Sequence, residues 1–217
     1  MTLVLHYHPL SSFCWKVLIP LYENGTEFEP RLLQNLQDPV ERDAFRALWP
    51  VGKMPLLVDE AHDRAIPETS IIIEWLDHHR RGATRFLPED PEQAREVRLW
   101  DRIYDLYAQQ PMQRIVFDRL RPPEHKNPNM VAEERELLTR TMAMVDAYVA
   151  DKHWATGDHF TLADCAAAPA LFYGDKVEPF AGRWPHALAL LERLKARPSI
   201  ARVLEEAAPW FQYFPKE

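Results

Sequence analysis

Residues 82–91 divide the chain into two stretches of different character. The segment holds one glycine and two prolines and has no apolar periodicity, which is typical of a linker. Before it, strand-like and helix-like patterns alternate, as in a small mixed sheet with helices packed on it. After it, apolar residues recur at helical spacing. The sequence therefore predicts an α/β part followed by an all-α part.

The predicted elements can be placed by residue. Strands are expected at 3–7, 27–33, 55–59 and 64–66, and helices at 12–24, 39–48 and 69–81. In the second part, Pro122-Pro123 is expected to separate the first long helix from the next. We expect one domain over 1–83, a linker over 84–90 and a second domain over 91–217.

Composition excludes several classes of protein. Hydrophobic residues make up 47% of the chain, enough for a substantial core, and the formal charge of -7 argues against nucleic acid or an anionic membrane as a partner. The longest apolar stretch, 162–173, is shorter than the roughly 20 residues of a membrane helix. Cys14 and Cys165 form no disulfide framework, and the first residues lack the charged region of a secretory signal. A soluble cytoplasmic protein is expected.

Two short motifs in the first part predict a site for a peptide-like ligand. Met54 precedes Pro55 and follows the Gly52 turn, so its backbone could pair with an extended peptide if the loop bends sharply. Thr69 stands at the start of the expected helix, where free amides favour a carboxylate, and Glu68 could meet an ammonium. A ligand with an α-amino acid end and a peptide body would satisfy all of these groups.

The first strand leads into a serine-containing turn. Ser11 and Ser12 stand where the expected helix begins, so a serine hydroxyl and the helix amides can stabilise the same anion. Each motif alone is also explained by an ordinary turn or helix cap. Their occurrence together, in this order, favours a site.

These motifs resemble those of the cytosolic glutathione S-transferase superfamily, and the resemblance covers essentially the whole chain. The run from Ser11 to Val17 is similar to the serine-type loops of zeta and tau class members, as in a bacterial serine-type enzyme. Gly52-Lys53-Met54-Pro55 and Glu68-Thr69 are similar to the family's proline loop and Glu-Ser motif. The resemblance implies a thioredoxin-like domain, an all-α domain, glutathione as cosubstrate, a homodimer and a role in detoxification.

The implied chemistry is activation of the glutathione thiol as thiolate for attack on a small hydrophobic electrophile. A thiol with a pKa near 8.5 is mostly protonated at pH 7, and a hydroxyl donor at a helix N-terminus can lower that pKa. The resemblance assigns this role to Ser11, with Ser12 as the alternative. Tyr7 is a third candidate, but we favour its interpretation as a half-buried strand aromatic.

The resemblance implies further roles by residue. Glutathione is expected to contact Lys53, Met54, Pro55, Glu68 and Thr69. The electrophile pocket is expected to include Leu10, Trp100, Tyr104, Tyr107 and Arg114. Thr161 and Asp164 are expected to form the capping box of a buried helix, and the apolar tail 209–214 to fold back over the cleft or the domain seam.

Other functions stay open or are disfavoured. The nine histidines offer no set with metal-ligand spacing, so no metal is expected. Ser11-Ser12 followed by Trp15 also resembles glutathione-dependent isomerases of the maleylacetoacetate type, although Phe13 stands where those carry cysteine. A non-catalytic binding or regulatory protein with the same fold is the alternative outside enzymes.

Overall fold

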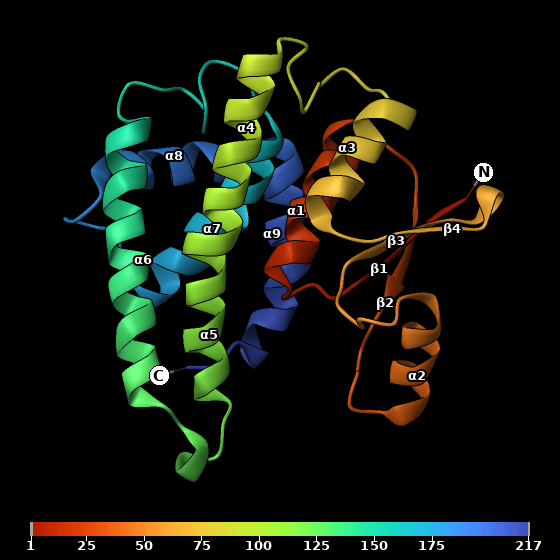
Figure 1. Cartoon of the computed structure of the whole chain (residues 1–217), viewed down its shortest axis with the longest axis horizontal. Helices are drawn as coiled ribbons and strands as arrows, with labels where there is room; N and C mark the ends of the chain where they lie inside the picture. Colours follow the sequence, from red (N-terminus) through yellow and green to blue (C-terminus); the bar gives the residue numbers. More distant parts are fainter. Residues whose placement is uncertain (1, 217) are drawn as a thin grey trace.

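The N-terminal half is a four-stranded mixed sheet with helices on both faces (Figure 1). The computed structural model describes residues 2–216. The strands are β1 (Leu3–Tyr7), β2 (Glu29–Leu32), β3 (Leu56–Asp59) and β4 (Arg64–Ile66), in the spatial order β2-β1-β3-β4. Only the β1–β2 pair is parallel. The helices are α1 (Ser12–Glu23), α2 (Pro39–Leu48) and α3 (Thr69–His79), with a short 3-10 turn η1 (Glu60–His62).

Alternation along β1 explains why both faces of the sheet are covered. Leu3 and Leu5 are fully buried in the main core with α1 and α3. His6 points to the opposite face and packs on Phe45 of α2, with ring centroids 5.7 Å apart. Successive strand side chains point to opposite faces, so one strand supplies both layers. This is the thioredoxin-like arrangement that the sequence predicts.

The C-terminal half is entirely helical among the described residues. Its helices are α4 (Pro91–Ile103), η2 (Tyr104–Gln109), α5 (Gln110–Arg119), η3 (Pro123–His125), α6 (Pro128–Val149), α7 (Leu162–Val177), α8 (Pro185–Ala196), α9 (Pro198–Ala207) and η4 (Ala208–Tyr213). Helix α7 lies at the centre and buries almost all of its side chains, many of them alanines. The capping box predicted at its start is present: the Asp164 carboxylate accepts a hydrogen bond from the Thr161 amide at 2.9 Å.

The segment η2 is a π-helical turn within one continuous rod formed by α4, η2 and α5. The amide of Gln110 donates to the carbonyl of Asp105, five residues earlier. Pro111 follows directly; it has no N–H, and its ring would crowd the carbonyl of Tyr107 in a regular α-helix. A wider turn relieves this crowding. Apolar spacing does not predict such a turn.

The two halves share one hydrophobic core. Trp15 of α1 is buried against Phe172 and Tyr173 of α7, with both pairs of ring centroids 4.9 Å apart. Residues 80–90 form no helix or strand, yet they are anchored: Phe86 is buried, and its carbonyl accepts a hydrogen bond from the Leu162 amide.

The strands and helices predicted for the first half are all present. The largest differences lie at element ends, because β2 covers only Glu29–Leu32 and α3 ends at His79. The predicted helix break at Pro122-Pro123 falls between α5 and α6 and is confirmed. The division into domains at 83 and 91 stays a prediction. No helix within residues 2–216 is long and apolar enough to cross a membrane.

Candidate active site

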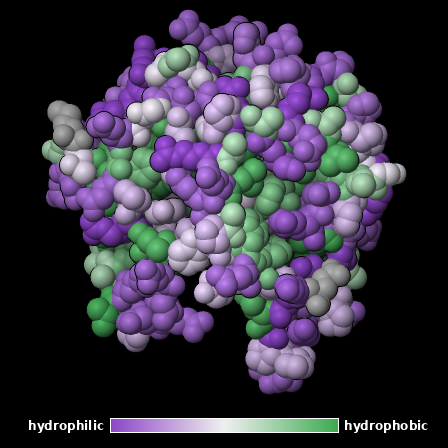
Figure 2. Space-filling model, turned by 180° about the vertical axis from the view of Figure 1, so that it is seen from behind, coloured by the Kyte–Doolittle hydropathy of each residue, from purple (hydrophilic) through white to green (hydrophobic). Residues whose placement is uncertain are grey.

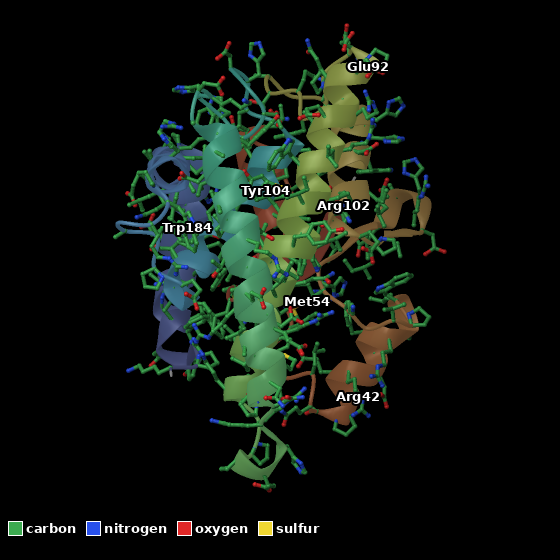
Figure 3. The ribbon with its side chains drawn as sticks, turned by 60° about the vertical axis from the view of Figure 1, so that its left-hand side comes forward. Arg42, Met54, Glu92, Arg102, Tyr104 and Trp184 are labelled. Atoms are coloured by element: carbon green, nitrogen blue, oxygen red, sulfur yellow. The ribbon has the colours of Figure 1, made fainter. Side chains whose placement is uncertain are left out.

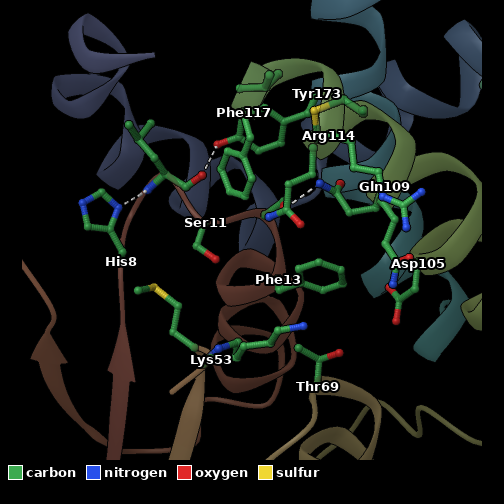
Figure 4. A pocket seen from close by; sticks show the side chains of 18 of the residues that line it. His8, Ser11, Phe13, Lys53, Thr69, Asp105, Gln109, Arg114, Phe117 and Tyr173 are labelled. Atoms are coloured by element: carbon green, nitrogen blue, oxygen red, sulfur yellow. Dashed lines mark hydrogen bonds between the residues drawn. The ribbon is translucent and has the colours of Figure 1, made fainter. Parts of the chain in front are cut away.

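A cavity of about 740 Å³ lies between the two halves. In the space-filling view the surface is notched between the lobe that carries α2 and the lobe that carries the ends of α5 and α6 (Figure 2). Four segments line the cavity: the β1–α1 loop, the loop before β3, the start of α3, and the η2–α5 face with the C-terminal tail (Figure 4). All three motifs of the N-terminal half therefore meet in one space.

Ser11 is the N-cap of α1 and lines this cavity. Its Oγ accepts a hydrogen bond from the Cys14 amide at 3.3 Å, as expected for a serine at a helix start. Because the hydroxyl oxygen is the acceptor in that bond, its proton remains available to donate. Two hydrogen bonds fix the β1–α1 loop around Ser11. The Ser11 amide donates to the His8 carbonyl, and the Tyr173 hydroxyl donates to the Leu10 carbonyl.

The two alternatives to Ser11 have different surroundings. Ser12 is buried, and its Oγ accepts a hydrogen bond from Gln109 Nε2 at 2.6 Å (Figure 4). Tyr7 does not line the large cavity; it borders a separate cavity of about 140 Å³ with Trp15 and Trp210. Burial raises the pKa of Tyr7, which disfavours its anion.

Cys14 is close to Ser11, but its thiol is not reactive at neutral pH. Its side chain is fully buried, and burial raises the pKa of the thiol to about 12. A cysteine acts as a nucleophile through its thiolate, so this thiol is an apolar packing group at neutral pH.

The loop before β3 forms the second wall. Gly52 has φ +68°, which favours glycine, and its amide donates to the Trp49 carbonyl at 2.8 Å. The Met54–Pro55 peptide bond is cis. Lys53, Met54 and Pro55 all line the cavity.

Glu68 and Thr69 form the third wall at the start of α3. Glu68 is outside the helix with φ +68°, an uncommon conformation for a non-glycine residue that costs about 1–3 kcal/mol. Among residues 2–216 no side chain caps the first amides of α3, so these donors are open to a ligand. Thr69 is nearly buried and lines the cavity beside them.

A buried cluster of charges joins the halves next to this wall. Lys16 Nζ on α1 lies 2.5 Å from Asp101 Oδ1 and 2.7 Å from Asp105 Oδ2, and it donates to Ser70 Oγ at 3.0 Å. Arg102 pairs with both aspartates from the more exposed side. Burial raises the pKa of Asp105, and Lys16 opposes that rise. The cluster fixes the position of α1 relative to α4 and η2.

The η2–α5 face is the fourth wall and contains residues that the sequence analysis missed. It contributes Asp105, Leu106, Gln109, Gln110, Gln113, Arg114, Val116, Phe117 and Leu120. Phe13 and the tail residues Tyr213, Phe214 and Pro215 complete the apolar part. The prediction that the tail folds back over the cleft is confirmed, since Phe211 and Phe214 pack on Tyr173.

The residues expected at the electrophile pocket separate into two groups. Leu10 and Arg114 line the cavity. Trp100 and Tyr104 lie instead in the helical core, and Figure 3 shows Tyr104 inside the bundle whereas Arg102 lies on the side of α3. Tyr107 is about half exposed and is not among the lining residues. The face of the rod that borders the cavity carries Arg102, Leu106, Gln109, Gln113 and Phe117, whereas Trp100 and Tyr104 belong to the face that packs in the helical core.

A thioredoxin-like half, a helical half and a cavity at their junction define the architecture of the glutathione S-transferases. The family model described as "Glutathione S-transferase, N-terminal domain" matches residues 5–84, and the one described as "Glutathione S-transferase, C-terminal domain" matches residues 109–198. The chain therefore belongs to the glutathione S-transferase superfamily.

Individual relatives are distant but match over most of the chain. A glutathione S-transferase of Hyoscyamus muticus is 25% identical over 94% of this chain and 99% of its own length. A stringent starvation protein A homolog of Coxiella burnetii is 28% identical over 78% and 75%. The crystal structure of a glutathione S-transferase from Methylobacterium radiotolerans in complex with glutathione sulfonate superposes with a TM-score of 0.81 at 26% identity, covering 94% of each chain.

Proposed function

We propose that this protein is a glutathione transferase in which Ser11 activates the glutathione thiol. The observation that carries the proposal is the position of Ser11: it caps α1 through its oxygen, keeps its hydroxyl proton available, and borders the same cavity as the Met54–Pro55 loop and Thr69. Glutathione in this cavity would place its γ-glutamyl carboxylate at Thr69 and the α3 amides, and its ammonium at Glu68. Met54 would pair with the peptide backbone, and Lys53 would meet the glycyl carboxylate.

The energetics are sufficient for this role. Lowering a thiol pKa from about 8.5 by two units takes about 2.7 kcal/mol. A hydrogen bond to a charged group contributes about 1.5–3 kcal/mol, and a helix N-terminus adds about 0.3–1 kcal/mol. The thiolate sulfur then forms a bond to the electrophilic carbon, and the leaving group departs with the bonding electron pair. Ser11 acts as a donor and is not itself a nucleophile.

A spectroscopic titration of enzyme-bound glutathione tests this assignment. The thiol pKa is expected to rise by about one to two units in Ser11→Ala. Ser12→Ala is the matched control, because Ser12 lines the same cavity but is only 5% exposed, and under this assignment it should leave that pKa within a few tenths of a unit. An unchanged thiol pKa in Ser11→Ala would show that another group activates the sulfur.

A non-catalytic binding or regulatory protein with the same fold is the competing function, and the Coxiella burnetii relative shows that not every similar protein carries the name of a glutathione transferase. Retention of the cavity and of all three motifs supports the transferase. Calorimetry with glutathione separates the two: no heat of binding at millimolar ligand would leave only the regulatory function. Isomerisation of a maleylacetoacetate-type substrate and a homodimeric assembly stay predictions.

A further inference from the structure

The proposed glutathione contacts leave both arginines of the cavity unused. Lys53 is assigned to the glycyl carboxylate, and Arg102 is held by two aspartates, Asp101 and Asp105. Arg114 extends from α5, on the opposite side of the cavity from the Met54–Pro55 loop, and its side chain is 59% exposed. A cation in this position is available to the second substrate.

Glu134 of α6 orients this guanidinium. Arg114 Nη1 donates to Glu134 Oε1 at 2.5 Å, and the Glu134 side chain is only 9% exposed. A guanidinium has five N–H donors in a planar fork, and within residues 2–216 Glu134 is the one hydrogen-bond partner of Arg114. The remaining edge of the fork can therefore meet a planar anion through two parallel hydrogen bonds.

Three amides lie on the same wall as Arg114. Gln109, Gln110 and Gln113 line the cavity from η2 and α5. Gln109 is buried, and its Nε2 donates a hydrogen bond to Ser12 Oγ. Its Oε1 has no hydrogen-bond partner within the described chain. This wall therefore offers hydrogen-bonding groups beside its apolar residues, whereas the resemblance implies a pocket for a small hydrophobic electrophile.

Aromatic side chains line the cavity as well. Phe13 comes from α1, Phe117 from α5, and Tyr213 and Phe214 from the tail, and Phe117 and Tyr213 are 54% and 66% exposed. Exposed aromatic faces favour a flat apolar ligand body through stacking and area burial. Figure 4 shows Phe13, Phe117 and Arg114 around the same space as Ser11.

We propose that the electrophile is an acidic aromatic compound, and that Arg114 selects it by pairing with its carboxylate. This inference rests on the proposed transferase function and specifies its second substrate. Arg114 takes no part in the bond changes: the glutathione sulfur attacks the ring carbon, and the leaving group departs with its electron pair. Arg114 holds the acid end so that the ring lies between the aromatic side chains and the sulfur.

A matched pair of electrophiles tests the proposal. A chloronitrobenzoate and the corresponding chloronitrobenzamide share the ring and the chloride leaving group and differ in charge. In Arg114→Gln, kcat/KM for the benzoate is expected to fall about tenfold, which is about 1.4 kcal/mol, mainly through KM. The value for the benzamide should stay within about twofold. Comparing each substrate between variants cancels the difference in intrinsic reactivity.

Two further variants serve as controls. Arg121→Gln removes the same charge from a residue just beyond α5 that does not line the cavity, and it should leave the benzoate preference unchanged. Arg114→Lys keeps the charge but not the planar fork, so it should restore part of the preference. Equal losses for both substrates in Arg114→Gln would overturn the proposal, because Arg114 would then serve the fold or glutathione.

A binding measurement covers the case in which neither compound reacts. With the site saturated by S-methylglutathione, wild-type protein should bind nitrobenzoate about tenfold more tightly than nitrobenzamide, measured by tryptophan fluorescence. Equal affinities would overturn the proposal for an acidic substrate while leaving the transferase function intact. Absence of S-methylglutathione and glutathione binding by calorimetry would instead overturn the proposed function itself.

Discussion

Asp164 is a buried carboxylate on which the start of the central helix depends. Its Oδ1 accepts from the Ala155 amide at 2.7 Å, and its Oδ2 accepts from the Thr161 amide at 2.9 Å. In Asp164→Ala both amides lose their acceptor inside the core, at about 1–3 kcal/mol each. The free energy of unfolding is expected to fall by about 2–5 kcal/mol in urea denaturation. Asp164→Asn keeps one acceptor oxygen and should lose less; equal stability of wild type and Asp164→Ala would contradict this account.

The same residue gives the protein a pH-dependent stability. Burial raises the pKa of Asp164 to about 6, above the value of about 3.9 expected in the unfolded chain. Between these values the folded chain binds more protons than the unfolded chain, so this group's contribution to the free energy of unfolding falls as pH rises from about 4 to 6. Asp164→Asn should lack that slope in denaturation curves recorded across this range. An identical pH profile in both proteins would exclude Asp164 as its source.

At the scale of elements, Lys16 ties α1 to the α4–η2 rod. Lys16→Met removes the buried cation that contacts both Asp101 and Asp105 and leaves them only the more exposed Arg102, and breaking such a buried pair costs about 3–5 kcal/mol. Adding Asp105→Asn removes one of the uncompensated charges and should recover part of that loss. Thermal and urea unfolding of the single and double variants measure the coupling. Additive losses in the double variant would show that the two side chains do not interact energetically.

Sequence patterns predicted most elements because their ends are set locally. Asp38, Asp90 and Asn127 cap the helices that follow them, and a proline stands at each first helical position. The π-helical turn was not predictable from apolar spacing, since it depends on how Pro111 is accommodated inside a continuous rod.

The residues of the candidate site also fall into those set by local sequence and those set by tertiary packing. Ser11, Met54–Pro55 and Glu68–Thr69 each lie in a short motif whose backbone conformation is encoded by neighbouring residues, so the sequence could identify them. Gln109, Phe13 and Phe117 line the cavity only through the packing of one half on the other. No local pattern distinguishes them from core or surface residues, and an aromatic stripe such as Trp100 and Tyr104 is typical of a core as well as of a pocket.

At the scale of the whole molecule, the C-terminal tail closes the cavity from the helical side. Phe211 packs on Trp15 and Tyr173, Phe214 packs on Tyr173, and Arg119 Nη1 donates to the Pro215 carbonyl at 3.2 Å. The tail lies far in sequence from the β1–α1 loop, yet residues of both segments line the cavity. It therefore contributes to the electrophile wall and not to the proposed glutathione contacts.

Removal of this tail should separate the two binding functions. A chain that ends at Pro209 loses the apolar contacts of Tyr213 and Phe214 with the electrophile, worth about 1 kcal/mol, so KM for an aryl halide is expected to rise roughly fivefold. Glutathione affinity by calorimetry should change little, because no proposed glutathione contact lies in the tail. A chain lacking only Lys216 and Glu217 is the control and should keep the wild-type KM.

Phe214→Ala gives the same test if the shorter chain fails to fold, which circular dichroism would reveal. A rise in the glutathione dissociation constant without a rise in the electrophile KM would reverse the assignment of this wall.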